Sequence, residues 1–442
     1  MRLAPALSGA FLHLALRRHF HYPLHPCNLR KRTPHALYPL SSAAPPTDFA
    51  AGLRPEALSV PESGIVEVFA YGRDRQGLIP MWSGESDIAT PAFICDAATR
   101  ALAAGETFYT HQGGIPELRA AIARYMTRIY GGRPDGTAFE PERFFVTVGG
   151  MQALELAMRM IASAGDEVIV PTPAWPNFAA SAGVNGAFVR QLPMTLQGSG
   201  DAAHWSLDLA ALEAAINPRT RCIIINSPSN TLGWTATRDE LTAILAMARH
   251  HNLWIVADEI YGRLVYTPER APSFHDVMAE GDKVMFVQTL SKNWAMTGWR
   301  LGWLEAPPQL GAMIENLIQY SSSGIAVFAQ RAAIAALEQG DALVAHQVAR
   351  ITRSRDILCK ALAATGRVTF ARPPGAFYLF CKIDGEPDSR ALCMHLVDGA
   401  GIGLAPGSAF GEGGRDYVLI CFARHPDQVA EASRRLVAWL TR

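Results

Sequence analysis

Five short apolar runs, separated by helical patterns, constrain the fold of this chain more than any other feature. The runs are Arg143–Val148, Glu167–Val170, Cys222–Asn226, Leu253–Ala257 and Val284–Gln288. Nearly every residue in them is apolar, which is typical of strands buried on both faces of a parallel sheet. The helical patterns between them include Gln152–Ala162, Leu207–Ala215 and Arg238–His250. This succession predicts an α/β fold with a mostly parallel central sheet flanked by helices.

Residues that can bind a ligand, through a polar group, an aromatic ring or a glycine turn, follow these runs. Because the carboxyl ends of parallel strands meet at one edge of a sheet, and ligands bind beyond that edge, we expect these residues to share one site. They are Gly149, Gly150 and Met151 after the first run, Trp175 after the second, Asn230 after the third, Asp258 and Tyr261 after the fourth, and Thr289, Ser291 and Lys292 after the fifth.

Composition and charge argue against several classes of function. The chain is 49% hydrophobic and 18% charged, with a formal net charge of zero, so nothing attracts it to nucleic acid or to an anionic membrane. Its seven cysteines include no Cys-x-x-Cys pair, and we expect neither a disulfide framework nor a metal site. No run of roughly 18 apolar residues occurs, so no transmembrane helix is expected. We predict a cytoplasmic protein that acts on small molecules.

The first 47 residues differ from the rest of the chain. They contain Arg and Lys residues but no Asp or Glu. An acid-free, arginine-bearing N-terminus resembles an organellar transit peptide. We favour the alternative, a disordered extension or a start codon placed too early, because the proline-rich stretch 34–46 has the composition of a linker. We exclude residues 1–47 from the fold, and organellar import stays the less favoured alternative.

The segment Ser291–Arg300 places a lysine and an arginine just after the fifth run. Lysine is scarce in this chain, with 5 Lys against 35 Arg, which suggests that the amine of Lys292 matters rather than its charge. An amine can form a Schiff base with an aldehyde cofactor, whereas a guanidinium cannot. Arg300 could then hold a phosphate dianion with its planar fork. The simpler alternative is that both are solvated surface charges.

The other residues after the runs supply complementary groups. The turn Gly149–Gly150 lets backbone N–H groups at a helix N-terminus face a phosphate. The carboxylate of Asp258 can keep a pyridine nitrogen protonated. Tyr261 and Asn230 can hydrogen-bond a phenolate oxygen, and Trp175 can stack on an aromatic ring. Together with the lysine and the arginine, these groups match one cofactor, pyridoxal 5′-phosphate.

Each of these residues also has a purely structural explanation. Asp is a favoured helix N-cap, Asn is common in tight turns, and Tyr and Trp pack in cores. Many strand-to-helix turns contain glycine. The segment Gly399–Gly403 could suggest a dinucleotide loop, but no strand–turn–helix pattern frames it, so we interpret it as a turn.

From about Leu78 to Ala423, the chain resembles the class I/II aminotransferases, which are fold-type I pyridoxal-phosphate enzymes. Four segments carry the resemblance in the family's order and spacing. They are Phe108–Arg119 (FYTHQGGIPELR), Val146–Leu154 (VTVGGMQAL), Asp258–Tyr266 (DEIYGRLVY) and Ser291–Trp303 (SKNWAMTGWRLGW). The loop Ser83–Asp87 is similar to an early loop of the family.

This resemblance implies roles for particular residues. Lys292 would form the Schiff base, with Asp258 and Tyr261 as its catalytic partners at the cofactor ring. The phosphate ligands would be Thr289, Ser291, Arg300 and, from the neighbouring subunit, Tyr109. The backbone of Gly84 and the side chain of Asn230 would bind the substrate. A homodimer is implied, because Tyr109 would act across an interface.

The resemblance also implies a fold-type I architecture. A large cofactor-binding domain would span residues 81–324, and a smaller α+β domain would combine 48–80 with 325–442. The helical runs Phe328–Leu337 and Asp341–Leu362 would lead into the smaller domain. The implied reaction moves an amino group from an amino acid or amine to a 2-oxo acid.

One strand departs from the family pattern. Members usually carry a C-terminal arginine that grips the substrate α-carboxylate, and here this position is Leu419, within Tyr417–Ala423. Arg424 would face the other side of an extended strand, and Arg415 lies roughly 13 Å along it. Different pyridoxal-phosphate chemistry, as in a β-elimination lyase, a decarboxylase or an amino-acid oxidase, therefore stays open as an alternative to transamination. A non-catalytic, DNA-binding regulator that holds the cofactor is a separate alternative, and the zero net charge argues against it.

Overall fold

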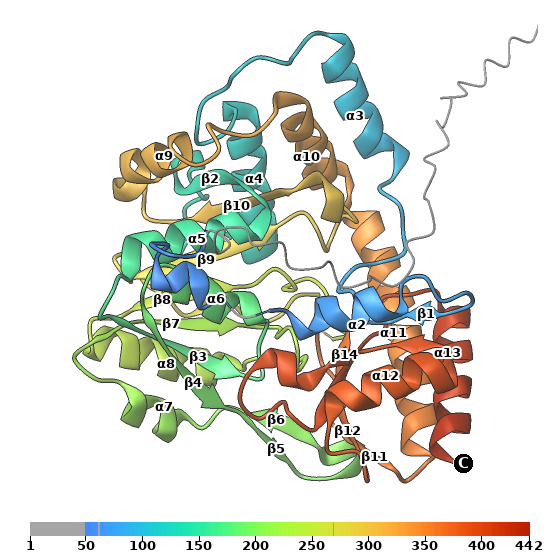
Figure 1. Ribbon diagram of the computed structural model, residues 1–442. Coiled ribbons are helices and arrows are strands. Elements are labelled where there is room, and N and C mark those ends of the chain that lie inside the picture. Colours follow the sequence, from blue (N-terminus) through green and yellow to red (C-terminus); the bar gives the residue numbers. More distant parts are fainter. Residues whose placement is uncertain (1–48, 61, 268) are drawn as a thin grey trace, which may run out of the picture. The chain divides into compact units, whose positions relative to one another are not determined.

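A seven-stranded sheet forms the centre of the fold (Figure 1). The computed structural model describes residues 49–60, 62–267 and 269–442, and the sheet order is β2-β10-β9-β8-β7-β3-β4. The strands are β2 Phe144–Val148, β3 Glu167–Thr172, β4 Phe188–Pro193, β7 Thr220–Asn226, β8 Trp254–Asp258, β9 Val284–Thr289 and β10 Leu301–Glu305. Only β10 is antiparallel to its neighbours. The predicted α/β class with a mostly parallel sheet is confirmed.

The five predicted strands all belong to this sheet, with ends shifted by one or two residues. Consecutive residues of β8, such as Ile255 and Val256, are both inaccessible to solvent. Because consecutive side chains point to opposite faces, both faces of the sheet are covered. The sequence did not reveal β4 and β10. β4 is an edge strand with half-buried residues, and β10 begins directly after Arg300, whose left-handed backbone ends a short 3-10 turn.

Helices connect and cover these strands. They are α3 Ala92–Ala103, α4 Pro116–Tyr130, α5 Gly149–Ile161, α6 Pro176–Val184, α7 Leu209–Ala215, α8 Arg238–His250, α9 Gly311–Gln319 and α10 Val327–Gln339. α8 has the predicted bounds, since Thr237 and Glu240 form a capping box at its start. The helix expected near Gln152 begins earlier, at Gly149. The glycine turn is therefore the first turn of α5 itself.

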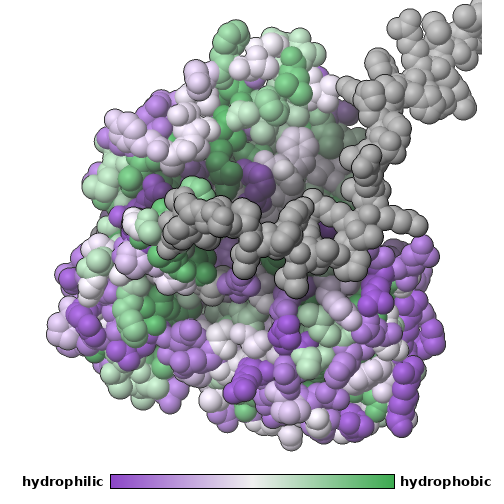
Figure 2. Space-filling model, viewed as in Figure 1, coloured by the Kyte–Doolittle hydropathy of each residue, from purple (hydrophilic) through white to green (hydrophobic). Residues whose placement is uncertain are grey.

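A second sheet, of four antiparallel strands, is formed by the C-terminal part of the chain. Its order is β11-β12-β15-β14, with β11 Val368–Phe370, β12 Tyr378–Ile383, β14 Ala405–Pro406 and β15 Tyr417–Cys421. The accompanying helices are α11 Asp341–Ala363, α12 Ser389–Ala400 and α13 Pro426–Leu440. Hydrophilic residues gather over α12 and α13 on the face shown in Figure 2. On α13, Glu431 pairs with both Arg434 and Arg435.

The N-terminal elements lie against this C-terminal part. They are α1 Pro55–Leu58, α2 Gly64–Gly72 and β1 Ile79–Pro80. β1 pairs in parallel with β13 (Ile402–Gly403), and α2 contacts α12 and β14. A separate hairpin consists of β5 Thr195–Gln197 and β6 His204–Ser206. Residues 53–442 form one compact unit, so the division into 81–324 and 48–80 plus 325–442 stays a prediction, while the extension 1–47 lies outside the described residues.

The turn predicted for Gly399–Gly403 is only partly correct. α12 ends at Ala400, Gly401 takes a left-handed conformation (φ 63°) that closes the helix, and β13 follows at once. This helix-to-strand order is the reverse of the strand–turn–helix order of a dinucleotide loop. Among the described helices, none is long and apolar enough to cross a membrane. The cytoplasmic location stays a prediction.

Candidate active site

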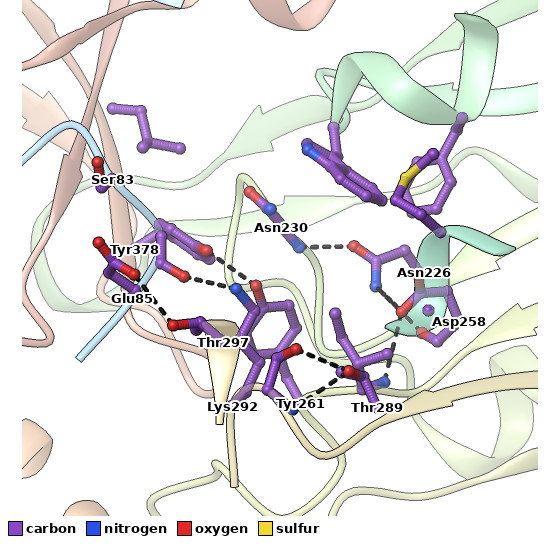
Figure 3. Close-up of a pocket in the computed structure, with 18 of the residues that line it drawn as sticks. Ser83, Glu85, Asn226, Asn230, Asp258, Tyr261, Thr289, Lys292, Thr297 and Tyr378 are labelled. Carbon is purple, nitrogen blue, oxygen red and sulfur yellow. Dashed lines mark hydrogen bonds between the residues drawn. The ribbon is translucent and has the colours of Figure 1, made fainter. Parts of the chain in front are cut away.

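A cavity of about 430 Å³ lies at the carboxyl ends of the central strands (Figure 3). All predicted site residues except Gly149 and Tyr109 line it. Those that line it are Gly84, Gly150, Met151, Trp175, Asn230, Asp258, Tyr261, Thr289, Ser291, Lys292 and Arg300. The strands β2, β3, β7, β8 and β9 all end at this edge, because they run in the same direction. Sheet topology thus brings these distant segments together, as the sequence predicted.

Strand register places Asp258 beside Asn226, at the ends of β8 and β7. The Asn226 amide nitrogen donates to Asp258 Oδ1 (3.1 Å) and to its main-chain oxygen (3.0 Å). The Asn226 amide oxygen accepts from the main-chain N–H of Asn230 (2.6 Å). Asn226 therefore ties the Asn230 loop to the carboxylate. The residues that follow Asp258 form turns, so the N-cap explanation for Asp258 is wrong.

The Asp258 carboxyl group is almost fully buried, with 1% of its surface exposed. Burial raises its pKa to about 7, and the neighbouring Glu259 adds to the rise. Its side-chain hydrogen bonds within the described residues, from Asn226 and from the N–H of Ile260, both end on Oδ1. A buried carboxylate is costly unless a cation pairs with it. Oδ2 is thus available to a cationic group in the cavity.

The Lys292 amine lies in the same cavity and donates a hydrogen bond to the main-chain oxygen of Gly84 (2.5 Å). Burial lowers the pKa of this amine, against the attraction of the Glu85 and Asp258 carboxylates. A lowered pKa increases the neutral fraction of an amine, which is the nucleophilic and basic form. The environment of Lys292 therefore suits an amine that reacts, and the interpretation as a solvated loop lysine is wrong.

Two tyrosine hydroxyls meet at one wall of the cavity. Tyr261 Oη and Tyr378 Oη lie 2.8 Å apart, and burial raises the pKa of both hydroxyls. Tyr261 therefore stays a neutral hydrogen-bond donor. Tyr378 lines the cavity, as Tyr261 does, while Phe377 packs against the Tyr261 ring, with the ring centroids 5.3 Å apart.

Glycine at position 84 is required by this tyrosine. A Cβ atom there would lie 2.1 Å from Tyr378 Oη. We predict that Gly84→Ala displaces Tyr378 and lowers kcat/KM by about 10- to 100-fold, since small misplacements near reacting groups have effects of this size. Steady-state kinetics and the melting temperature would be measured. In the control Gly311→Ala, the new Cβ makes only ordinary contacts, and unchanged kinetics are expected. Equal losses in both variants would contradict the packing argument.

Anion-binding groups gather at the other end of the cavity. Thr289 Oγ1 and Ser291 Oγ lie 2.9 Å apart, and the Arg300 guanidinium donates to the main-chain oxygen of Thr297 (2.8 Å). A Cβ at Gly149 would lie 2.6 Å from Arg300 Nη2, so glycine lets the guanidinium approach the N-terminus of α5. Two hydroxyls, a guanidinium and a helix N-terminus together suit a phosphate dianion.

Arg300 adopts a left-handed backbone conformation, with φ 53°. This conformation costs a non-glycine residue on the order of 1 kcal/mol, and such strain is common where function fixes a side chain. It directs Arg300 toward the Gly149 turn. Gly149 itself does not line the cavity but shapes its anion-binding end.

The cavity wall contains Leu419 where the family resemblance implied an arginine. Leu419 is buried, with 2% of its surface exposed. Neither Arg415 nor Arg424 lines the cavity, so neither of the two candidate substitutes is in place. Among the described residues that line it, the cations are Lys292 and Arg300.

Tyr109 lies outside the cavity of its own chain. Its side chain is 95% exposed, and the neighbouring Phe108 is 82% exposed. Its role in a neighbouring subunit stays a prediction. The residues that sequence reasoning missed include Asn226, Ile65 and Phe410. Asn226 could have been predicted, since it is the last residue of a predicted strand. Ile65 and Phe410 could not, because they reach the cavity from α2 and from a 3-10 turn near the C-terminus.

Comparison with known proteins identifies the family. The model of the family described as aminotransferase class I and II matches residues 77–436. This chain belongs to the class I and II aminotransferases. It is 32% identical to an aspartate aminotransferase of Pyrococcus horikoshii over 382 residues, which is 86% of this chain and 95% of the relative. It is also 32% identical to a probable N-acetyl-LL-diaminopimelate aminotransferase of Bacillus subtilis, over 87% of this chain and 94% of that one.

Solved structures agree with this assignment. The aspartate aminotransferase of Thermotoga maritima matches with a TM-score of 0.80 and 30% identity, covering 88% of this chain and 100% of that chain. The N-succinyldiaminopimelate aminotransferase of Mycobacterium tuberculosis also gives a TM-score of 0.80, with 28% identity over 87% of this chain. The predicted family, fold type and aminotransferase activity are confirmed. These relatives give no support to lyase, decarboxylase or oxidase chemistry.

Proposed function

We propose that this aminotransferase binds pyridoxal 5′-phosphate in the cavity through Lys292 and moves the amino group of an amino acid or amine to a 2-oxo acid. One observation carries the proposal. A lysine amine with a lowered pKa, a buried carboxylate and a cluster of anion-binding groups share one cavity. The same residue types carried the prediction from the sequence, and the family match supports it independently.

The residues present fit the cofactor. When bound, it supplies an aldehyde that takes up the amino group and a ring that accepts the electrons released at the substrate carbon. Oδ2 of Asp258 would pair with the ring nitrogen, and the ring face would meet Trp175. The ring oxygen would accept hydrogen bonds from Tyr261 and Asn230. The phosphate would be held by Gly150, Thr289, Ser291 and Arg300.

The chain's own groups then have distinct tasks. The neutral amine of Lys292 would accept the proton from the substrate carbon, as a general base, and then deliver it as a general acid to the cofactor carbon C4′. The main-chain oxygen of Gly84 orients that amine through its hydrogen bond. The ionised carboxylate of Asp258 holds a proton on the ring nitrogen by charge attraction. Tyr261, neutral because burial raises its pKa, donates a hydrogen bond and carries no charge of its own.

An absorbance titration tests this function. Purified protein loaded with pyridoxal 5′-phosphate would be titrated with a panel of amino acids and amines. We expect the visible cofactor band to bleach with an effective donor and to return when a 2-oxo acid is added. Bleaching without return, together with release of ammonia or carbon dioxide, would instead favour an elimination or decarboxylation reaction.

We also propose that the enzyme is a homodimer in which Tyr109 completes the partner's site. Exposed large aromatic side chains support an interface, because burying such side chains against a partner is favourable. Phe108, Tyr109 and Tyr320 are 82%, 95% and 86% exposed.

A mixing experiment tests the shared site. Tyr109→Ala and Lys292→Ala homodimers should each be nearly inactive, since every site lacks one group. Random exchange of subunits gives about half mixed dimers, each with one intact site, and should restore roughly a quarter of full activity. Light scattering would report the mass. A fully active monomer, or mixing without recovery, would contradict the proposal.

A further inference from the structure

The hydroxyl of Tyr378 lies at the cavity wall, and the proposed function gives it no task. Its oxygen is 2.8 Å from Tyr261 Oη (Figure 3), and Tyr261 is its only hydrogen-bond partner within the described part of the chain. The two residues are 1% and 0% exposed. Because both hydroxyls are buried within one chain, their contact does not depend on a second subunit.

The number of protons in this pair fixes the direction of the hydrogen bond. A tyrosine hydroxyl has one proton to donate, and its oxygen can also accept. In the proposed function, Tyr261 gives its proton to the ring oxygen of the cofactor, so toward Tyr378 it can only accept. Tyr378 is therefore the donor. The order is from Tyr378 to Tyr261, and from Tyr261 to the ring oxygen.

The electrostatics of the pair agree with this direction. Burial raises the pKa of both hydroxyls. The hydrogen bond between them lowers the pKa of Tyr261 against the effect of burial, and it raises the pKa of Tyr378 further. A hydroxyl that accepts a hydrogen bond becomes a stronger donor, and bonds in such a chain strengthen one another by about 10 to 30%.

Packing holds the Tyr378 hydroxyl in place. Tyr378 is the first residue of β12 and pairs with Cys421 of β15. Its ring packs edge-on against the Tyr261 ring, with the centroids 5.8 Å apart, and it contacts the Phe377 ring at 4.8 Å. The backbone of Gly84 lies beside its hydroxyl, since a Cβ there would be 2.1 Å from Tyr378 Oη. These contacts keep the hydroxyl against Tyr261.

Resting on the proposed function, we propose that Tyr378 is a positioning residue whose hydroxyl donates to Tyr261 and thereby directs the Tyr261 proton to the ring oxygen of the cofactor. In pyridoxal 5′-phosphate this oxygen stands beside the aldehyde carbon, so it shares a proton with the Lys292 nitrogen once the two are joined. Without the Tyr378 hydroxyl, Tyr261 is a weaker donor. The ring oxygen then keeps more negative charge and holds the shared proton to a higher pH.

An absorbance titration with pH tests this role without turnover. The midpoint is the pH at which the visible band of the bound cofactor changes. Tyr261→Phe should raise it by about 1 to 2 pH units, the effect of losing a hydrogen bond to a charged group. Tyr378→Phe should raise it by about 0.3 to 0.6 pH units, since a neighbour strengthens that bond by up to about 30%. In the Tyr261→Phe background, Tyr378→Phe should leave the midpoint unchanged, because Tyr378 acts through Tyr261.

Tyr266 provides a matched control. Its hydroxyl donates to the main-chain oxygen of Ala376 (2.6 Å), two residues before Tyr378. Tyr266→Phe therefore removes a tyrosine hydroxyl that supports the same segment, and it should leave the midpoint unchanged. The other titratable groups near Lys292 and the tyrosine pair are Cys421, Glu85, Arg300 and Asp258. They are the same in all of these variants, so a change in the midpoint reports on the tyrosines.

A fluorinated tyrosine gives a change of opposite sign. Fluorine on the ring makes the hydroxyl a stronger acid and thus a stronger donor. With 3-fluorotyrosine at position 378 alone, the midpoint should fall below that of the parent. Loss of packing at Tyr378 would not reverse the sign between the two substitutions, so the pair of variants distinguishes hydrogen bonding from a structural defect.

The two proposals fail in different ways. If the cofactor binds and no donor of any class bleaches its band, the proposed function is overturned and the role of Tyr378 falls with it. If donors react but Tyr378→Phe leaves the midpoint unchanged or lowers it, the proposed function stands and only the role of Tyr378 is overturned. An equal rise with and without the Tyr261 hydroxyl, or a rise with 3-fluorotyrosine, would overturn that role in the same way.

Discussion

Replacing Lys292 with alanine is expected to lower the rate of transamination by at least about four orders of magnitude, because the variant loses both the nucleophile and the general base. The fold should survive, since the amine makes one hydrogen bond within the described residues, to the Gly84 oxygen. Turnover would be measured with a donor found in the titration. Circular dichroism and the melting temperature would report folding.

Two further variants distinguish the effect of the reactive amine from the effect of its positive charge. Lys292→Arg keeps a cation but has no reactive amine, so it should be as inactive as the alanine variant. Lys360→Ala, at an exposed position on α11, should retain full activity. Substantial turnover in either Lys292 variant would show that another group carries out the proton transfer.

Asp258→Asn should reduce kcat by about 100- to 1000-fold, because a neutral amide cannot stabilise a protonated ring nitrogen and so weakens the electron sink. The amide has nearly the same shape as the carboxylate, so the contact with Asn226 and the β8 register should persist. A small loss of activity would mean that the ring nitrogen does not depend on Asp258.

The same variant should change how the stability of the cofactor-free protein depends on pH. Burial raises the pKa of Asp258 from 3.8 to about 7, so between these values the folded protein holds a proton that the unfolded chain has released. The contribution of Asp258 to stability is therefore fully present below about pH 4 and is lost as the pH rises through about 7. Asparagine cannot titrate. The melting temperature of Asp258→Asn minus that of the parent should rise from about pH 5 to about pH 8.

Glu259 provides an internal control for this experiment. Its pKa is also raised to about 7 by burial, but it is present in both proteins, so most of its contribution cancels in the difference. Binding of the cofactor should remove the effect, because a cation beside Asp258 favours the ionised carboxylate. A flat difference across this pH range would contradict the assigned environment of Asp258.

Much of the central sheet was predictable because strands buried on both faces leave unbroken apolar runs. The residues after those runs, from Gly150 to Lys292, meet in one cavity because parallel strands end at one edge. β4 and β10 escaped prediction for physical reasons. β4 is half-exposed at an edge of the sheet and lacks an apolar run. β10 follows a chain reversal at Arg300, and nothing in the sequence indicates that this arginine adopts a left-handed backbone conformation.

The rest of the site depends on tertiary packing between distant segments. Ile65 and Phe410 reach the cavity from the N-terminal and C-terminal parts of the chain, and no local pattern marks either of them. The Tyr261–Tyr378 contact joins the turn after β8 to the first residue of β12, and the position of Tyr378 explains why residue 84 must be glycine.

Peptide mapping after borohydride reduction tests the central claim most directly. The cofactor-loaded protein would be reduced, digested and analysed by mass spectrometry, with Lys292→Arg as the control. A pyridoxyl phosphate mass on the peptide that contains Lys292, absent from the control, is the predicted result. The mass on another lysine, or on no peptide of a protein that binds the cofactor, would contradict the assignment of Lys292 and with it the proposed mechanism.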